Sequence, residues 1–113
     1  MDTVRKILID AGNLEMLPAI PAVYAILEYG YGPGDFVCRY MGESKDLRQA
    51  LMNHFDPHEP NITLRYFMLS DKIKFLHFEP LNGSASKEYK AKIEGWRRRY
   101  VSAIQLYLII DNG

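Results

Sequence analysis

Basic and aromatic side chains gather near the end of this sequence. The run Trp96-Arg97-Arg98-Arg99-Tyr100 is the strongest local charge cluster, and Lys87, Lys90 and Lys92 extend it along one expected helix. A basic helix with aromatic residues could follow a phosphate backbone, so these residues are candidates for binding nucleic acid. The alternative is a solvated helix face whose C-terminal arginines interact favourably with the helix dipole.

A second group of chemically capable residues lies between Tyr40 and Phe55. Tyr40 ends a strand-like run, and Gly42 fits a turn in which the backbone can approach another group closely. A helix is expected next, with Ser44 as its N-cap, because apolar residues recur at helical spacing at Leu47, Leu51 and Phe55. This helix carries Arg48 and ends near His54.

Residue type alone supports plainer interpretations of the same positions. Tyr24 and Tyr40 could be strand tyrosines that pack in a core, and Glu94 could be a solvated helix glutamate. His54 could be an ordinary residue at a helix end, because one histidine without a partner is weak evidence for a catalytic base.

Composition limits the classes of protein that fit. The chain has 113 residues, which predicts one domain with a single modest core. Lys plus Arg equals Asp plus Glu at 14 each, so a nucleic-acid site would have to be a local patch. The single Cys38 excludes an intramolecular disulfide framework and a cysteine-rich zinc site. No signal peptide or membrane span is indicated, and we expect a soluble, cytoplasmic protein that does not bind membranes.

Hydrophobic periodicity predicts the elements that must position these residues. We expect a hairpin of strands at Val23–Tyr29 and Phe36–Met41, joined by a glycine-rich loop, with Phe36, Cys38 and Tyr40 on one face. A third strand is expected from Ile73 to Glu79, ending at Pro80. The remaining expectations are a short helix at 4–8, an extended connector at 17–21, a proline-punctuated loop at 56–61, a strand or a short helix at 62–69, a helix at 87–100, and a helix or last strand at 101–110.

Ala22-Val23-Tyr24 and Tyr40-Met41-Gly42 resemble the two signature tripeptides of the GIY-YIG nuclease superfamily. The residues after Tyr40 are similar to the family's turn, helix and His-aromatic ending in order and spacing. Glu94, with Tyr100, resembles the later helix that carries the family's acidic residue. The resemblance covers about Ile20 to Tyr100. It implies a single domain over 1–113 of the α/β (α+β) class, with a small antiparallel three-stranded sheet flanked by helices. It also favours a short helix over a strand at 62–69.

The resemblance also implies a division of chemical roles. Tyr24 and Tyr40 match the family's tyrosines, which hold or activate the attacking water in phosphodiester hydrolysis. Glu94 matches the carboxylate that binds one divalent ion, so Mg²⁺ or Mn²⁺ is the expected cofactor if the protein is active. His54 belongs to the same set of candidate catalytic residues.

The family's phosphate-binding arginine has no counterpart, because Ala50 stands at its position. Arg48 is rotated by about 200° from Ala50 on a helix, and it could substitute only after a local shift. Arg39 precedes Tyr40 and is expected on the opposite side of the sheet. Glu43 is acidic where many members have a basic residue, and no late asparagine matches within 104–107.

The leading hypothesis is therefore a nuclease-related nucleic-acid-binding domain, with DNA as the expected partner and a partly degenerate site for metal-dependent cleavage. The alternative is a non-catalytic protein-interaction or homodimerisation domain that uses apolar surface such as 101–110. An active nuclease that uses Arg48 is a third possibility.

Overall fold

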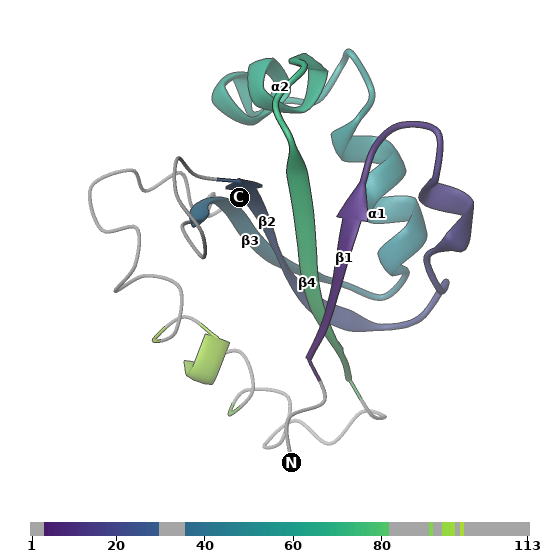
Figure 1. The fold of residues 1–113 in the computed structure, drawn as a ribbon. Helices are drawn as coiled ribbons and strands as arrows, with labels where there is room; N and C mark the ends of the chain where they lie inside the picture. Colours follow the sequence, from purple (N-terminus) through teal and green to yellow (C-terminus); the bar gives the residue numbers. More distant parts are fainter. Residues whose placement is uncertain (1–3, 30–35, 82–90, 92–93, 97, 99–113) are drawn as a thin grey trace.

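The computed structural model describes residues 4–29, 36–81, 91, 94–96 and 98. They form an α+β fold around one four-stranded antiparallel sheet with the order β1-β4-β2-β3 (Figure 1). The expected sheet had three strands, so that part of the fold prediction was wrong. The elements in chain order are β1 (Arg5–Ile9), the 3₁₀ helix η1 (Leu14–Met16), β2 (Ala22–Tyr29), β3 (Phe36–Ser44), α1 (Leu47–His54), α2 (Ile62–Leu69) and β4 (Lys74–Pro80).

The additional strand is β1, where the sequence favoured a short helix. Arg5 to Ile9 pair with Phe78 to Lys74 of β4, so tertiary pairing decides the structure of this short apolar run. Its position at the sheet edge explains why Arg5, Lys6 and Leu8 are exposed while Ile9 is buried. The prediction of a short helix at 62–69 was confirmed by α2.

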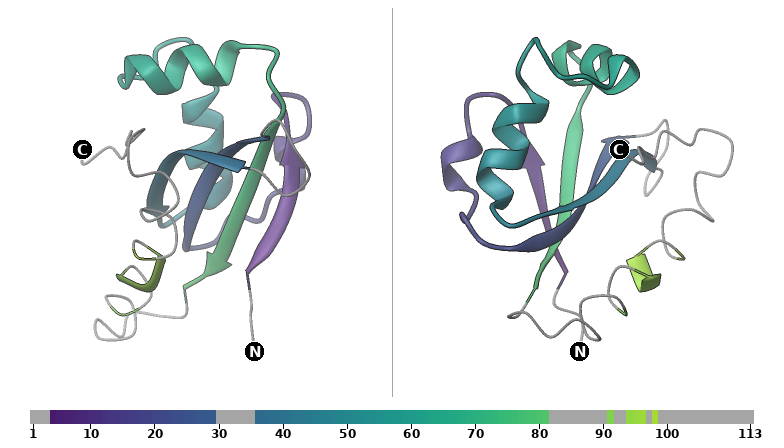
Figure 2. Two further views of the ribbon diagram at one scale, coloured as in Figure 1. Left: turned by 60° about the vertical axis from the view of Figure 1, so that its left-hand side comes forward. Right: turned by 180° about the vertical axis from the view of Figure 1, so that it is seen from behind.

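The helices lie on both sides of the sheet. Helices α1 and α2 and the 3₁₀ helix η1 lie on one side, and the helical residues 94–96 lie on the other, as the two views in Figure 2 show. Within the described part of the chain, no helix is both long and apolar enough to cross a membrane.

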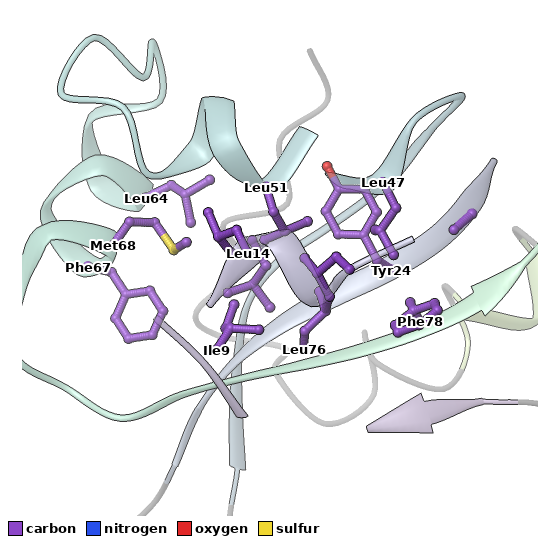
Figure 3. Close-up of a cluster of buried hydrophobic side chains, with 13 residues drawn as sticks. Ile9, Leu14, Tyr24, Leu47, Leu51, Leu64, Phe67, Met68, Leu76 and Phe78 are labelled. Carbon is purple, nitrogen blue, oxygen red and sulfur yellow. The ribbon is translucent and has the colours of Figure 1, made fainter. Parts of the chain in front are cut away.

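The two faces of β2 supply two separate apolar clusters. Tyr24 and Ile26 pack with α1 and α2 in the larger cluster, which Figure 3 shows together with Leu47 and Leu51. Val23, Ala25 and Leu27 pack on the opposite face in the second cluster, which contains Trp96. Because successive side chains of a strand alternate between faces, Tyr24 must face α1 once Val23 faces Trp96.

A β-bulge in β3 determines which way Tyr40 faces. Ile26 pairs with Tyr40 but the next residue, Leu27, pairs with Cys38, so Arg39 is the extra residue of β3. The side-chain alternation therefore changes at this point: Cys38 packs in the second cluster and Tyr40 packs against the larger one. The expectation that Phe36, Cys38 and Tyr40 share a face was wrong for this reason.

The bulge also brings Arg39 to the α2 side of the sheet, contrary to the expectation from simple alternation. Arg39 donates through Nε to Glu28 Oε1 at 2.8 Å, and its guanidinium carbon lies 5.7 Å from the centre of the Phe67 ring. Lys72 Nζ lies 3.4 Å from the other oxygen of Glu28. Arg39 is therefore held in an ion-pair cluster away from Ala50.

This cluster predicts a loss of stability in acid. Burial by itself would raise the pKa of Glu28, but the hydrogen bonds and charges of Arg39 and Lys72 outweigh it and hold the pKa below its ordinary value of 4.5. A lowered folded-state pKa stabilises the fold above pH 4.5 and ceases to do so as the pH falls through the folded-state pKa. We expect urea unfolding of Glu28→Gln to depend less on pH below 4.5 than unfolding of the parent protein. The control Glu15→Gln removes an exposed carboxylate and should retain the parent's pH dependence; equal pH dependence for both variants would contradict this account.

Candidate active site

The two signature tyrosines converge over Gly42. Tyr24 in β2 pairs directly with Gly42 in β3, and the ring centres of Tyr24 and Tyr40 are 6.0 Å apart. A Cβ placed on Gly42 would lie 3.2 Å from each tyrosine hydroxyl and 2.8 Å from Cε2 of Tyr40. The absence of a side chain at Gly42 therefore makes room for both hydroxyls.

Helix α1 brings His54 to the same point. Leu47, Leu51 and His54 are its buried residues and share one face of the helix. His54 Nε2 lies 2.7 Å from the hydroxyl of Tyr24, and the ring centres of His54 and Tyr40 are 4.7 Å apart. The helix is capped by Asp46, which accepts from the Gln49 backbone, rather than by Ser44 as expected.

Glu59 completes the cluster and was missed by the sequence analysis. Its Oε1 lies 2.5 Å from His54 Nδ1, and its Oε2 accepts from the backbone N–H of Asn61 at 2.8 Å. Glu59 is 6% exposed although it lies in a proline-rich loop. A carboxylate five residues after a helix-end histidine, followed by Pro60 and the helix cap Asn61, was the available signal.

The electrostatic environment of Tyr24 keeps its hydroxyl protonated. Burial raises the pKa of the phenol well above its ordinary value of 10.0, and the neighbouring Tyr40, Glu59 and Glu43 raise it further. Tyr24 is therefore a neutral phenol at physiological pH, and its phenolate is not available as a resident base.

A surface pocket of about 660 Å³ opens beside this cluster. Tyr24, His54 and Glu59 line it, together with Ala50, which stands where the resemblance places the phosphate-binding arginine. Counting Glu59, the pocket wall carries four carboxylates and one lysine. Its polar and charged residues besides Tyr24 and His54 are Glu43, Ser44, Lys45, Asp46, Gln49, Asn53, Asp56, His58 and Glu59. The wall is therefore weakly suited to a phosphate anion.

Arg48 does not line this pocket. Its Nε donates to the backbone carbonyl of Leu17 at 2.7 Å, which ties α1 to the connector before β2. Arg48 therefore holds the connector in place and does not reach the pocket, where an active nuclease that uses Arg48 would need it to contact phosphate.

Glu94 is not brought to the tyrosines. It is exposed and lies 3.9 Å from Arg98 on the same helix. Trp96, two residues after Glu94, is buried in the second cluster, on the face of the sheet opposite to Tyr24. Its Nε1 donates to Glu79 at 2.9 Å. Among the described residues, no group of three or more His, Cys, Asp or Glu side chains is placed to hold a metal ion. Glu94 therefore does not fit as a metal ligand at the tyrosine pocket.

Most of the expected basic surface lies outside the described residues. Arg98 is described and exposed. The candidates that fall outside are Lys87, Lys90, Lys92, Arg97 and Arg99, and so does the apolar segment 101–110.

Comparison of the chain with protein-family models, curated proteins and solved structures gave no match. A neutral phenol in contact with a histidine, which in turn contacts a buried carboxylate, can pass a proton from the pocket to the imidazole.

Proposed function

We propose that this chain is a GIY-YIG-like domain that binds nucleic acid, with a partly degenerate site for phosphodiester cleavage. The observation that carries the proposal is the convergence of Tyr24, Tyr40 and His54 at Gly42 beside a pocket. These residues come from two strands and a helix, and their side chains meet although 30 residues separate Tyr24 from His54.

The proposed proton route runs through Tyr24. Water in the pocket gives its proton to the Tyr24 oxygen as Tyr24 gives its own proton to His54 Nε2. The resulting hydroxide attacks phosphorus, the bond from phosphorus to the leaving sugar oxygen breaks, and that oxygen takes up a proton from solvent. This coupled transfer avoids a free phenolate, which the raised pKa of Tyr24 disfavours. Tyr40 packs against His54 and shares the space above Gly42 with Tyr24, so it holds the water and the imidazole in place.

The weak element of the site is stabilisation of the phosphate charge. Ala50 supplies no cation, and Glu43 is exposed at the pocket wall where it repels a phosphate. Loss of one preorganised electrostatic contact typically costs about a hundredfold to a thousandfold in rate. The proposed activity is accordingly slow cleavage, assayed with Mg²⁺ or Mn²⁺ because the family resemblance implies one of them, with binding through the basic segment 87–99 as the stronger property.

Restoring a cation at the pocket tests this proposal. We expect Ala50→Arg to raise the rate of cleavage of labelled branched or linear DNA by about a hundredfold, because the guanidinium would meet the phosphate beside Tyr24. The rate is measured with Mg²⁺ or Mn²⁺ and with a chelator. Met52→Arg is the matched control, because Met52 is exposed on the same helix but does not line the pocket. Equal rates for the two arginine variants would count against the proposed role of the pocket.

A different observation favours the protein-interaction alternative. Ile62, Tyr66 and Leu69 follow one another at helical spacing on α2 and are 57%, 72% and 54% exposed. An exposed apolar stripe of this kind is typical of a surface that meets another protein. Self-association that weakens in Tyr66→Ser, together with no binding of DNA, would favour this function over the first.

A further inference from the structure

We propose that Glu59 is a positioning residue that fixes the tautomer of His54, so that Nδ1 carries the ring proton and Nε2 accepts from Tyr24. The consequence for catalysis rests on the proposed function. The assignment of the tautomer does not depend on the proposed function, and it is measured on the protein without substrate.

The loop between α1 and α2 holds Glu59 at both its backbone and its side chain. Its backbone N–H donates to the carbonyl of Asp56 at 3.0 Å, and Pro60 restricts the backbone of Glu59 because it follows directly. Its Oε2 accepts from the backbone N–H of Asn61, whose own side chain caps α2 by accepting from Leu64 at 3.0 Å. The carboxylate is thus anchored to the start of α2 before it meets His54.

The hydrogen-bonding capacity of a carboxylate sets the direction of the next contact. An ionised carboxylate can only accept, and one oxygen of Glu59 already accepts from Asn61. The other oxygen, 2.5 Å from His54 Nδ1, therefore requires that Nδ1 carry a proton. In the neutral imidazole Nε2 is then a lone-pair acceptor, and the 2.7 Å contact with Tyr24 must be an O–H that donates to nitrogen.

Burial makes this selection strong. Glu59 and His54 are 6% and 8% exposed, so water does not compete effectively for either group. The opposite tautomer would place the Nδ1 lone pair against a carboxylate oxygen and the Nε2 proton against the Tyr24 hydroxyl. With Nε2 protonated, the imidazole could not accept the Tyr24 proton, so the proposed route from the pocket to His54 would be closed.

The ¹⁵N chemical shifts of the His54 ring report the tautomer directly. The shifts are measured at pH 8.5, above the range in which histidines usually titrate, and are assigned by replacing each of the three histidines in turn. We expect a pyrrole-type Nδ1 and a pyridine-type Nε2 in the parent protein. In Glu59→Gln we expect the shifts to exchange, at least in part, because a glutamine amide can donate to Nδ1. A pyrrole-type Nε2 in the parent protein, in a neutral or a doubly protonated ring, would overturn the proposal.

A matched control uses the other histidine–carboxylate pair of the loop. His58 Nδ1 lies 2.9 Å from Asp56 Oδ1, but the two side chains are 94% and 53% exposed. We expect Asp56→Asn to leave the His54 shifts unchanged. Unchanged His54 shifts in folded Glu59→Gln as well would contradict the proposal, because the carboxylate would then not select the tautomer.

Cleavage measurements separate this inference from the proposed function. If Ala50→Arg cuts DNA, adding Glu59→Gln should lower its rate by at least about a hundredfold, as loss of the orienting carboxylate does in other histidine relays. If neither protein cuts but the shifts behave as expected, the proposed function fails and the role of Glu59 stands. A normal rate with Glu59→Gln would overturn the positioning role.

Discussion

Replacing His54 with alanine is expected to lower the free energy of unfolding by about 3–5 kcal/mol, from lost hydrogen bonds and lost packing together. The substitution removes the group that contacts the buried Glu59 carboxylate at 2.5 Å and the Tyr24 hydroxyl at 2.7 Å. The buried carboxylate loses its hydrogen-bond donor and does not fully recover its hydration, which costs more than the hydrogen bond contributes when both groups are present. His54 also packs against the ring of Tyr40, so the alanine leaves space in the wall of the pocket.

Urea unfolding of His54→Ala measures this cost. His58→Ala is the control, because His58 contacts a carboxylate in the same loop but its side chain is 94% exposed. We expect no measurable change for His58→Ala. His54→Gln retains a donor and an acceptor and should fall between His54→Ala and the parent protein. Equal unfolding midpoints for His54→Ala and His58→Ala would contradict the buried cluster.

The second large effect is expected at Gly42. An alanine Cβ there would lie 2.8 Å from Cε2 of Tyr40 and 3.2 Å from each tyrosine hydroxyl. The backbone at Gly42 is outside the left-handed region, so the effect is purely steric. Tyr24 is buried in the core and the half-buried Tyr40 packs against it, so the rings have little room to move and we expect Gly42→Ala to destabilise the protein by about 1–3 kcal/mol.

Alanine at Gly95 should have the opposite effect on the stability of the protein. Gly95 is helical and a Cβ there meets no atom within 4 Å, so alanine is expected to stabilise the helix by up to about 1 kcal/mol. Unfolding of both variants gives the comparison, and the ring shifts of His54 show whether its contact with Tyr24 is lost in Gly42→Ala. A neutral Gly42→Ala with unchanged His54 shifts would mean that the hydroxyls do not converge over this glycine.

The family resemblance singled out Tyr24, Tyr40 and His54 as site residues, and these three residues do meet. The spacing of apolar residues also predicted α1 and the strands β2, β3 and β4 because each is a long or regular segment.

Other features depend on contacts between distant segments. The run that forms β1 is too short for periodicity to decide, and its pairing with β4 decides instead. The bulge at Arg39 reverses the side-chain alternation before Tyr40 without any glycine or proline in the sequence to mark it. Glu59 gains its significance only because the loop folds back on the end of α1. The place of Glu94 depends on which face of the sheet its helix covers, and a helix pattern does not specify that face.

The central claim is that the Tyr24–His54 contact moves a proton during phosphodiester cleavage. Its most direct test is the rate of DNA cleavage by Ala50→Arg with and without the second substitution Tyr24→Phe, which removes only the hydroxyl. The account predicts that the double variant loses at least about a hundredfold in rate, because general acid–base catalysis contributes about 10²–10⁴-fold. A double variant that cleaves as fast as Ala50→Arg would show that the hydroxyl takes no part, and the account would be wrong.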